Sequence, residues 1–314
     1  MRRDSILRET IEDDPPAREL LKALRDLVEY YRRIHGFMAG HLAAAYDILK
    51  EARSKSDIRI LSFTGNIIAS GIRGLVAWLI KEGHFNLVIT TCGAVDHDIA
   101  KSVGGLYYRG SFALDDDALE SLEVHRLGNV LIPQENYGPL VEKVVRRVFE
   151  EGGISGRNLP GYKLLWHVGS MLDDERSFLR AAWQRGVPVI VPGFYDGSFG
   201  TNVLVYSRLH NTTIDLSEDQ KLLENTFFTA SGKKIAALIL GGGISKHHAI
   251  WWSQFAGGLD YAVYVTTAVE YDGSLSGAHP KEAISWRKLK RKAKYVVVYG
   301  DVTLVLPILA SALV

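Results

Sequence analysis

The chain has little cysteine, little net charge and no long apolar run. Cys92 is its single cysteine, which excludes an internal disulfide and suits a reducing compartment. A formal net charge of +1 gives no overall attraction to nucleic acid or to an anionic membrane. The apolar stretch 302–314 is too short to cross a bilayer, and the N-terminus is too charged for a secretion signal. We therefore expect a cytoplasmic protein with no nucleic-acid partner and no membrane partner.

The chain does have enough apolar sequence for a sizeable core. Hydrophobic residues make up 47% of its 314 residues and charged residues 23%, which is typical of a soluble globular protein. Residues 1–15 are predicted to be loosely structured, whereas apolar residues recur with a helical period over 17–34 and 38–52. We expect residues 1–55 to form an N-terminal helical cover on residues 56–314, within one compact domain.

From residue 57 onward the pattern alternates between strands and helices. The predicted strands are 58–63, 86–91, 129–132, 187–191, 235–240, 260–267 and 295–299. Predicted helices lie between them, at 64–81, from 95 onward, and at 138–152, 161–172, 174–185 and 217–230. Strands made of continuous Val, Ile and Leu runs are typical of a parallel sheet that is buried on both faces. The predicted fold class is α/β: a Rossmann-like, doubly wound, mostly parallel sheet with helices on both faces.

Polar or glycine-rich clusters follow the carboxyl ends of the predicted strands. They are 64–66 (TGN), 91–93 (TCG), 196–198 (DGS), 241–243 (GGG), 267–268 (TA) and Asp301. Ligands of open α/β sheets bind in the crevice at this edge. Because loops are polar in any case, one cluster alone says little, but six at one edge predict a ligand site.

The segment 233–288 combines several of these signals. Its buried strand 235–240 enters the turn 241–243 at the start of a helix, where backbone N–H groups can face an anion. The pair His247-His248 follows, and the segment closes on Glu282 and Trp286, which share a face if this part is helical. A GGG turn by itself is more often only a tight turn.

Together these motifs resemble the C-terminal half of deoxyhypusine synthase. LGGGISKHH and TTAVEYDGSLSGAHPKEAISWRK carry the resemblance, and TGNIIASGIRG, VITTCGAVDHDIAKSV, RLGNVLIPQENY and VPGFYDGSFGTNVL extend it over 36–314. The resemblance implies a Rossmann-like homotetramer with NAD at its subunit interfaces. It also implies a reaction in which the 4-aminobutyl group of spermidine moves, through an imine on an enzyme lysine, to one lysine of a translation factor.

The resemblance implies roles for individual residues. Lys288 would form the Schiff base, for which its amine must be partly neutral, and His247 would be a general base that contacts the substrate. Substrate would be bound by Asp96, Gly242, Gly273, Ser274, Glu282 and Trp286. NAD would be bound by Asn66, Thr91, Cys92, Gly93, Asp196, Thr267, Ala268, Asp301 and Val302. No metal ion is implied, and His248 is expected to be structural.

Several positions depart from the family pattern. His97 replaces a glutamate, Thr201 and Leu275 each replace an aspartate, Trp251 replaces an asparagine, and Asp96 is shorter than the family's glutamate. Desolvating an amine without a paired anion costs several kcal/mol. The sequence therefore predicts a pocket that is less negative and more apolar than a spermidine site.

Three functions stay open. The chain could be a deoxyhypusine synthase with a relaxed site, a relative acting on a less cationic amine as homospermidine-forming relatives do, or a non-catalytic NAD-binding subunit beside an active paralogue. Loss of the carboxylates argues against the first, and retention of Lys288, Trp286 and Glu282 argues against the third. The basic run 288–294 is open as well: without the resemblance it indicates a solvated helix end, and it could also dock an acidic partner.

Overall fold

The structure, a computed structural model, describes residues 2–314 and is built on one six-stranded sheet. The strand order is β11-β10-β9-β1-β2-β7, and every neighbouring pair is parallel. The strands are β1 (Ile58–Phe63), β2 (Leu87–Ile89), β7 (Val189–Ile190), β9 (Ile235–Leu240), β10 (Leu259–Thr266) and β11 (Leu289–Tyr299). The predicted α/β class and its parallel sheet are confirmed.

Both faces of the sheet are covered because its strands are apolar on both sides. All residues of β9 are buried, and successive side chains of a strand point to opposite faces. Leu238 packs in one core with α3 (Met38–Lys55), α5 (Arg73–Lys81) and α15 (Val302–Ala310). Ile239 packs in a second core with α12 (Leu216–Phe228) and α13 (Gly243–Ser253). Burying this apolar area, worth about 25 cal/mol per Å², is the main stabilising term.

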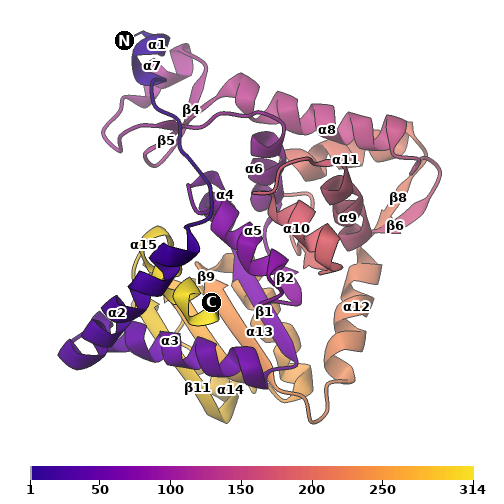
Figure 1. The fold of residues 1–314 in the computed structure, drawn as a ribbon. Coiled ribbons are helices and arrows are strands. Elements are labelled where there is room, and N and C mark those ends of the chain that lie inside the picture. The colour runs from indigo at the N-terminus through magenta and orange to yellow at the C-terminus, as the bar shows by residue number, and fades with distance from the viewer. Residues whose placement is uncertain (1) are drawn as a thin grey trace.

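A helical lobe lies beyond the carboxyl ends of β1 and β2 (Figure 1). Its elements are α4 (Gly65–Ala69), α6 (Cys92–Ser102), α7 (Asp116–Ser121), α8 (Gly138–Glu151), α9 (Gly161–Met171), α10 (Phe178–Arg185) and α11 (Ser198–Leu209). Two small sheets belong to it: antiparallel β3 (Tyr108–Arg109), β5 (Val130–Pro133) and β4 (Val124–Leu127), and parallel β6 (Asn158–Pro160) with β8 (Thr213–Asp215).

The predicted strand 129–132 lies in this lobe and not in the main sheet. Leu127 pairs with Val130, so Gly128 and Asn129 form a two-residue hairpin turn, with Gly128 at φ +63°. A Gly-Asn turn between two short apolar runs is typical of a hairpin, which is why this segment pairs locally. Its assignment to the parallel sheet is wrong.

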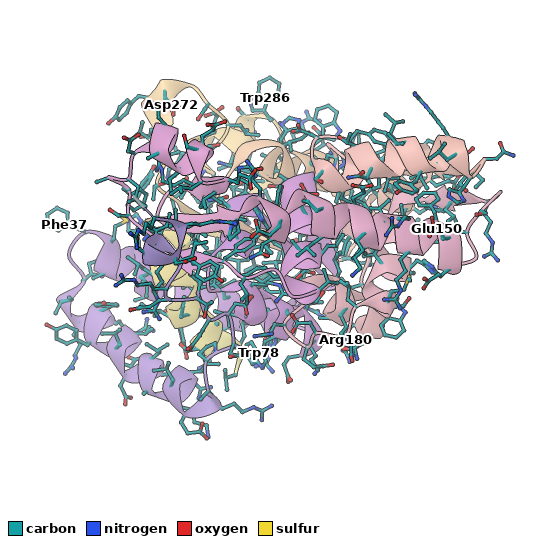
Figure 2. All side chains as sticks on the ribbon, turned by 90° about the horizontal axis from the view of Figure 1, so that it is seen from above. Phe37, Trp78, Glu150, Arg180, Asp272 and Trp286 are labelled. Carbon is teal, nitrogen blue, oxygen red and sulfur yellow. The ribbon has the colours of Figure 1, made fainter. Side chains whose placement is uncertain are left out.

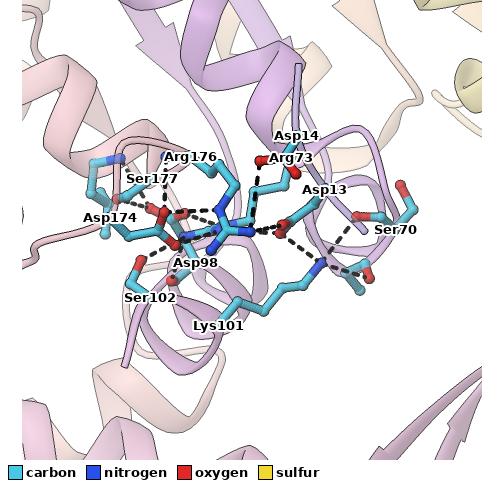
Figure 3. Close-up of polar contacts among 12 residues, drawn as sticks. Asp13, Asp14, Ser70, Arg73, Asp98, Lys101, Ser102, Asp174, Arg176 and Ser177 are labelled. Carbon is cyan, nitrogen blue, oxygen red and sulfur yellow. Dashed lines mark hydrogen bonds and ion pairs between the residues drawn. The ribbon is translucent and has the colours of Figure 1, made fainter. Parts of the chain in front are cut away.

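The N-terminal region is held more firmly than its sequence predicts. It contains α1 (Arg3–Ile6), Thr10 bridges Tyr108 beside β5, and the side chain of Asp13 is buried in a cluster of ion pairs (Figure 3). Then α2 (Arg18–Ile34) and α3 follow, and α3 packs against β11 and β10. Residues 11–15 form no helix or strand, as predicted, but Asp13 is fixed within them because it pairs with buried cations.

Other boundaries differ from the predictions for local reasons. The helix predicted over 64–81 breaks into α4 and α5 around Gly71, where a Cβ would lie 2.8 Å from the carbonyl oxygen of Glu12. Residues 290–294 of the basic run lie in β11, an edge strand that starts at Leu289 instead of 295. Lys288 follows the end of α14 (Glu282–Ser285) but is buried, so the interpretation of the run as a solvated helix end is wrong. Edge strands with lysines resist pairing with other chains.

The remaining helices are short 3-10 turns at Gln134–Asn136, Gln254–Ala256, Glu270–Asp272 and Ser311–Leu313. Within residues 2–314, every helix is either too short or too polar to cross a membrane.

Candidate functional site

The first cleft lies at the carboxyl ends of β1, β9, β10 and β11, and its empty volume is about 840 Å³. We call it the glycine cleft, because Gly241, Gly242 and Gly243 form part of its wall. Six residues predicted to bind ligand line it: Asn66, Gly242, Thr267, Ala268, Asp301 and Val302. The structure thus brings together residues from four strand ends that are far apart in the sequence.

The three glycines are required for two reasons: Gly242 by the close approach of the segment 273–281, and Gly241 and Gly243 by their backbone conformation. A Cβ on Gly242 would lie 2.4 Å from the Cα of Ser276, a distance that no side chain tolerates. Gly241 and Gly243 have φ of +82° and +67°, the region that favours glycine. The N–H of Gly243 donates to Ser276 Oγ at 3.1 Å. The turn therefore leaves backbone, and not side chain, at the floor of the cleft.

The charges around the glycine cleft suit a ligand with both anionic and hydroxyl groups. Helices α13 and α15 both begin at this cleft, so their N-termini present partial positive charge to it. Asp301 caps α15 by accepting from the N–H of Thr303 at 2.8 Å, and its carboxylate lies on the rim. A carboxylate beside helix N-termini at a strand edge is the arrangement that binds sugar hydroxyls and phosphates of nucleotides.

The second cleft surrounds Lys288 and has an empty volume of about 760 Å³. We call it the lysine cleft. Four residues with predicted roles line it: His247, Glu282, Trp286 and Lys288. Figure 2 shows the side chain of Trp286 projecting from the edge of the molecule at which Asp272 also lies, and Trp286 is 63% exposed.

The end of α14 aims Lys288 into this cleft. Arg287 adopts a left-handed conformation with φ +56° and its N–H donates to Ile284 O at 3.0 Å. The N–H of Lys288 donates to Ala283 O at 2.9 Å. These two bonds form a Schellman motif, which reverses the chain direction at a helix end. Lys288 consequently enters β11 with only 8% of its surface exposed.

Two indole rings flank the ammonium of Lys288. Its Nζ lies 5.3 Å from the ring centre of Trp286 and 5.6 Å from that of Trp251. His247, one turn before Trp251 on α13, stacks on the same indole with 5.8 Å between ring centres. Burial, and then the nearby charge of Lys288, lower the pKa of His247 below its ordinary value. His247 is thus a neutral imidazole near neutral pH, the form that can accept a proton.

The second imidazole of the pair lies outside this arrangement. His248 Nε2 accepts from Trp252 Nε1 at 3.2 Å, and burial lowers the pKa of His248 to about 4. His248 is therefore a neutral ring on α13 that pairs with Trp252 of the same helix, which agrees with the structural role predicted for it.

The remaining predicted residues fall into two groups. Gly273 and Ser274 are exposed and line neither cleft in this chain. Thr91, Cys92, Gly93, Asp96 and Asp196 lie around the N-terminus of α6 and the segment before α11, where they also line neither cleft. Gly93 lies close to Gly65, the neighbour of the cleft residue Asn66, because a Cβ on Gly65 would lie 2.8 Å from the carbonyl carbon of Gly93.

Asp96 is engaged within its own chain. Its carboxylate accepts from the N–H groups of Phe199 at 2.6 Å and Ser198 at 3.0 Å, and from the hydroxyl of Tyr137 at 2.9 Å. Burial raises its pKa against the effect of these bonds. Asp96 thereby holds the start of α11. Cys92 lies beside it, and burial together with Asp96 raises the pKa of this thiol to about 12, so it stays protonated.

The positions that depart from the family pattern separate in space. Trp251 and Leu275 both line the lysine cleft. His97 is buried instead, with its Nδ1 2.7 Å from the hydroxyl of Tyr107, and burial lowers its pKa to about 4. Thr201 is exposed on α11. The apolar replacements thus surround Lys288, whereas His97 and Thr201 lie elsewhere in the chain.

The sequence interpretation gave no role to Lys246, Tyr264 and Ser276, which also line the clefts. The sequence could have indicated a role for Lys246, because this lysine directly precedes the His247-His248 pair. Its burial could not be predicted, because it depends on packing of α13 against the distant segment 273–281.

The family is decided by a sequence comparison. The family model for deoxyhypusine synthase matches residues 26–313. The chain belongs to the deoxyhypusine synthase family. A relative in Sulfurisphaera tokodaii named "Probable deoxyhypusine synthase" is 50% identical over 313 residues, covering 100% of this chain and 99% of the relative. One of the same name in Aeropyrum pernix is 56% identical over 294 residues, covering 93% of this chain and 94% of the relative.

The fold of the deoxyhypusine synthase family is also found by comparing structures. The crystal structure of a deoxyhypusine synthase family protein from Entamoeba histolytica matches with a TM-score of 0.60, covering 92% of this chain and 91% of that one. The identity between the two is 19%, so this likeness concerns the fold alone. This chain is therefore a deoxyhypusine synthase-like enzyme, and the two clefts lie on its six-stranded sheet.

Proposed function

We propose that this protein is an NAD-dependent transferase that moves an aminobutyl group from a polyamine, spermidine, to a lysine through an imine on Lys288. The observation that carries the proposal is the lysine cleft, where a buried lysine lies between two indoles and beside a neutral imidazole. A shielded amine with a proton acceptor nearby is what imine formation needs. The acceptor lysine would belong to a translation factor, and the protein would act as a cytoplasmic homotetramer.

Each residue of the lysine cleft has a task in this chemistry. Lys288 Nζ, once deprotonated, adds to the imine carbon of the oxidised donor, and the 1,3-diaminopropane part leaves as an amine. His247 accepts and returns the protons that these steps move. Trp251 and Trp286 would pack against the butyl chain of the new imine, and Glu282 would pair with the ammonium at the far end of that chain. The acceptor lysine then displaces Lys288 from the same carbon.

The glycine cleft fits NAD, which the family chemistry requires. Asp301 and Asn66 would hold ribose hydroxyls, and the N-termini of α13 and α15 would face the phosphates. When bound, NAD supplies the reaction with a hydride acceptor and later a hydride donor. The chain's own part is to hold the cofactor and to keep the lysine cleft dry.

Borohydride trapping tests this proposal. Protein, NAD and spermidine are mixed, the imine is reduced, and the peptide that contains Lys288 is examined by mass spectrometry. We expect an aminobutyl adduct on Lys288 and none in Lys288→Ala. Lys290→Ala is the matched control, because Lys290 lies two residues further on and pairs with Asp260 at 2.8 Å, outside the cleft. If the wild type binds NAD yet forms no adduct, the proposed transfer is wrong.

A second candidate, transfer from a less cationic amine, is favoured by Trp251 and Leu275. Both replace polar residues of the family pattern and both line the lysine cleft. A spermidine titration by calorimetry separates the two candidates, since tight and saturating binding would rule out the second. The buried Lys288 between its two indoles argues against a third candidate, a non-catalytic subunit, because such a subunit would not need this lysine.

A further inference from the structure

One short segment separates the two clefts. Within 273–281, Ser276 lines the glycine cleft, whereas Leu275, Ala278 and His279 line the lysine cleft. We call this segment the partition. The contacts that fix the position of the partition therefore determine the shape of both clefts. They also determine the distance between the two bound ligands.

The partition is anchored first on the side of the glycine cleft. Ser276 Oγ accepts from the N–H of Gly243 at 3.1 Å, and Ser276 O accepts from Thr266 Oγ1 at 3.3 Å. Next to it, a Cβ on Gly277 would lie 1.8 Å from the carbonyl oxygen of Val269. These contacts hold the middle of the partition against the ends of β9 and β10.

Lys246 supplies the anchor on the other side. From α13 its Nζ donates to Ala278 O at 2.7 Å and to Ser276 O at 3.5 Å. The same ammonium lies 4.6 Å from the ring centre of Tyr264 on β10, and Lys246 is 1% exposed. Ser276 O is therefore shared by Thr266 and Lys246, which join the partition to the sheet and to α13.

This ammonium is held without an ion pair. Among residues 2–314, no carboxylate oxygen lies within 4.0 Å of Lys246 Nζ. The negative charge of Glu282 raises the pKa of Lys246 only from a longer distance. Burial lowers the pKa of Lys246 to about 8, which shows how costly its charge is in this place. A methionine would fill a similar volume without that cost. What the lysine adds is a set of directed donor bonds to the partition.

We propose that Lys246 is a positioning residue: by tying the partition to α13, it sets the approach of the amine at Lys288 to the ligand of the glycine cleft. The inference rests on the proposed function, in which a hydride passes between the two clefts. Reacting atoms must come within about 3.5 Å, and a shift of 1 Å can cost about 100-fold in rate. Loss of the tie therefore affects the rate more than the binding of either ligand.

The test compares Lys246→Met with wild type by the rate of adduct formation on Lys288 at saturating NAD and spermidine. We expect a fall of about 10- to 100-fold, with the NAD dissociation constant and the KM for spermidine changed by less than about threefold. Lys246→Arg, which keeps donors, is expected to recover part of the rate. Lys221→Met, on the exposed face of α12, is the control and keeps the wild-type rate. A Lys246→Met rate within about twofold of wild type overturns the proposal, as does a loss confined to KM or to NAD binding.

Two further measurements cover the other outcomes. If Lys246→Met does not fold, Thr266→Val takes its place: it removes the second bond to Ser276 O and also the bond that Thr266 Oγ1 accepts from the N–H of Ala268 at 3.1 Å. Because this variant loosens the partition at two points, an unchanged rate in it overturns the proposal. If the wild type forms no adduct, the proposed function is wrong. Amide hydrogen exchange in 273–281 then tests, independently of activity, whether Lys246 holds the partition in place. We expect exchange there to rise about tenfold in Lys246→Met, and unchanged exchange would show that Lys246 does not hold the partition.

Discussion

At the scale of single residues, the surroundings of Lys288 are aromatic where a polyamine site would be acidic. Trp251 and Trp286 lie within 5.6 Å and 5.3 Å of its ammonium, and Glu282 is the one carboxylate among the residues that line the cleft. An indole face attracts a cation by about 0.5–2 kcal/mol. A hydrogen bond to a charged group contributes about 1.5–3 kcal/mol. Contacts with indole faces therefore hold a donor with several charges less strongly than carboxylates would.

Leu275→Asp should restore part of this binding. A carboxylate at this position of the partition would face the lysine cleft and could pair with one ammonium of spermidine. We expect the KM for spermidine to fall about tenfold, which corresponds to about 1.4 kcal/mol, and the gain to shrink as salt is added. Leu275→Asn, of the same shape but uncharged, is the control. Equal KM values for the two variants would show that charge at this position does not select the donor.

Sequence reasoning placed the local residues of the site better than the distant ones. Glu282, Trp286 and Lys288 meet in one cleft because a single turn of helix and its Schellman end bring them together, a local geometry that the spacing already predicts. Asp96 was predicted to bind substrate, yet in this chain it caps α11, about a hundred positions later. A cap between distant segments leaves no periodic signal in either of them.

At the scale of elements, one helix is capped by the side chain of another. Asp219 on α12 accepts from the N–H of Tyr162, at the start of α9, at 3.1 Å, and a Cβ on Gly161 would lie 2.4 Å from its Oδ2. Asp219 is 3% exposed, and burial raises its pKa to about 6 against the effect of its backbone hydrogen bonds. The cap therefore joins α12 to α9, but it requires that the carboxylate of Asp219 be buried.

Asp219→Asn should reveal this charge as a dependence of stability on pH. Because the pKa in the folded state is raised, the folded state binds the proton more tightly than the unfolded state does. The stability that Asp219 contributes is then complete below about pH 4 and is lost as the pH rises through about 6. We expect the wild type to lose on the order of 2 kcal/mol relative to Asp219→Asn between these values in urea unfolding. A constant difference between the wild type and Asp219→Asn over this pH range would contradict the prediction.

The elements that the sequence predicted well are those with a strong apolar pattern. β1, β9 and β10 match their predicted ranges closely because continuous Val, Ile and Leu runs are buried on both faces. β11 begins earlier than predicted because its first half is basic and lies at the edge of the sheet, where one side is open to water. The pairing with β10 also shifts there, from Leu259 with Leu289 to Tyr261 with Lys294, so residues 290–293 have no partner in β10. Apolar patterns detect buried strands, so they do not detect an exposed and irregular segment of this kind.

At the scale of the whole molecule, a buried ion cluster fastens the N-terminal segment to the lobe. The cations of Arg73, Lys101 and Arg176 meet the carboxylates of Asp13, Asp98 and Asp174, as Figure 3 shows. Arg73 is fully buried. Asp13 is the member contributed by the N-terminal segment, and it contacts all three cations. Removing one partner of such a cluster leaves buried charge without compensation.

Asp13→Ala should therefore destabilise the protein by about 3 kcal/mol, because Arg73 and Lys101 lose a shared carboxylate while they stay buried. Asp14→Ala is the matched control, since the side chain of Asp14 is 72% exposed and lies 3.8 Å from Arg176. We expect less than about 0.5 kcal/mol for the control. Urea unfolding of both variants measures the difference, and equal midpoints would show that the cluster does not hold the segment.

The strand order of the main sheet also has a consequence during synthesis. β1 lies between β2 and β9, and Ile58 pairs with Ile235, so one edge of β1 stays open until β9 has left the ribosome. At about 5–20 residues per second, that interval lasts on the order of ten seconds or more. An apolar strand with an open edge can pair with another chain during this time. The nascent chain is thus most exposed to aggregation before the glycine turn is made, and a chaperone that shields β1 would act in that interval.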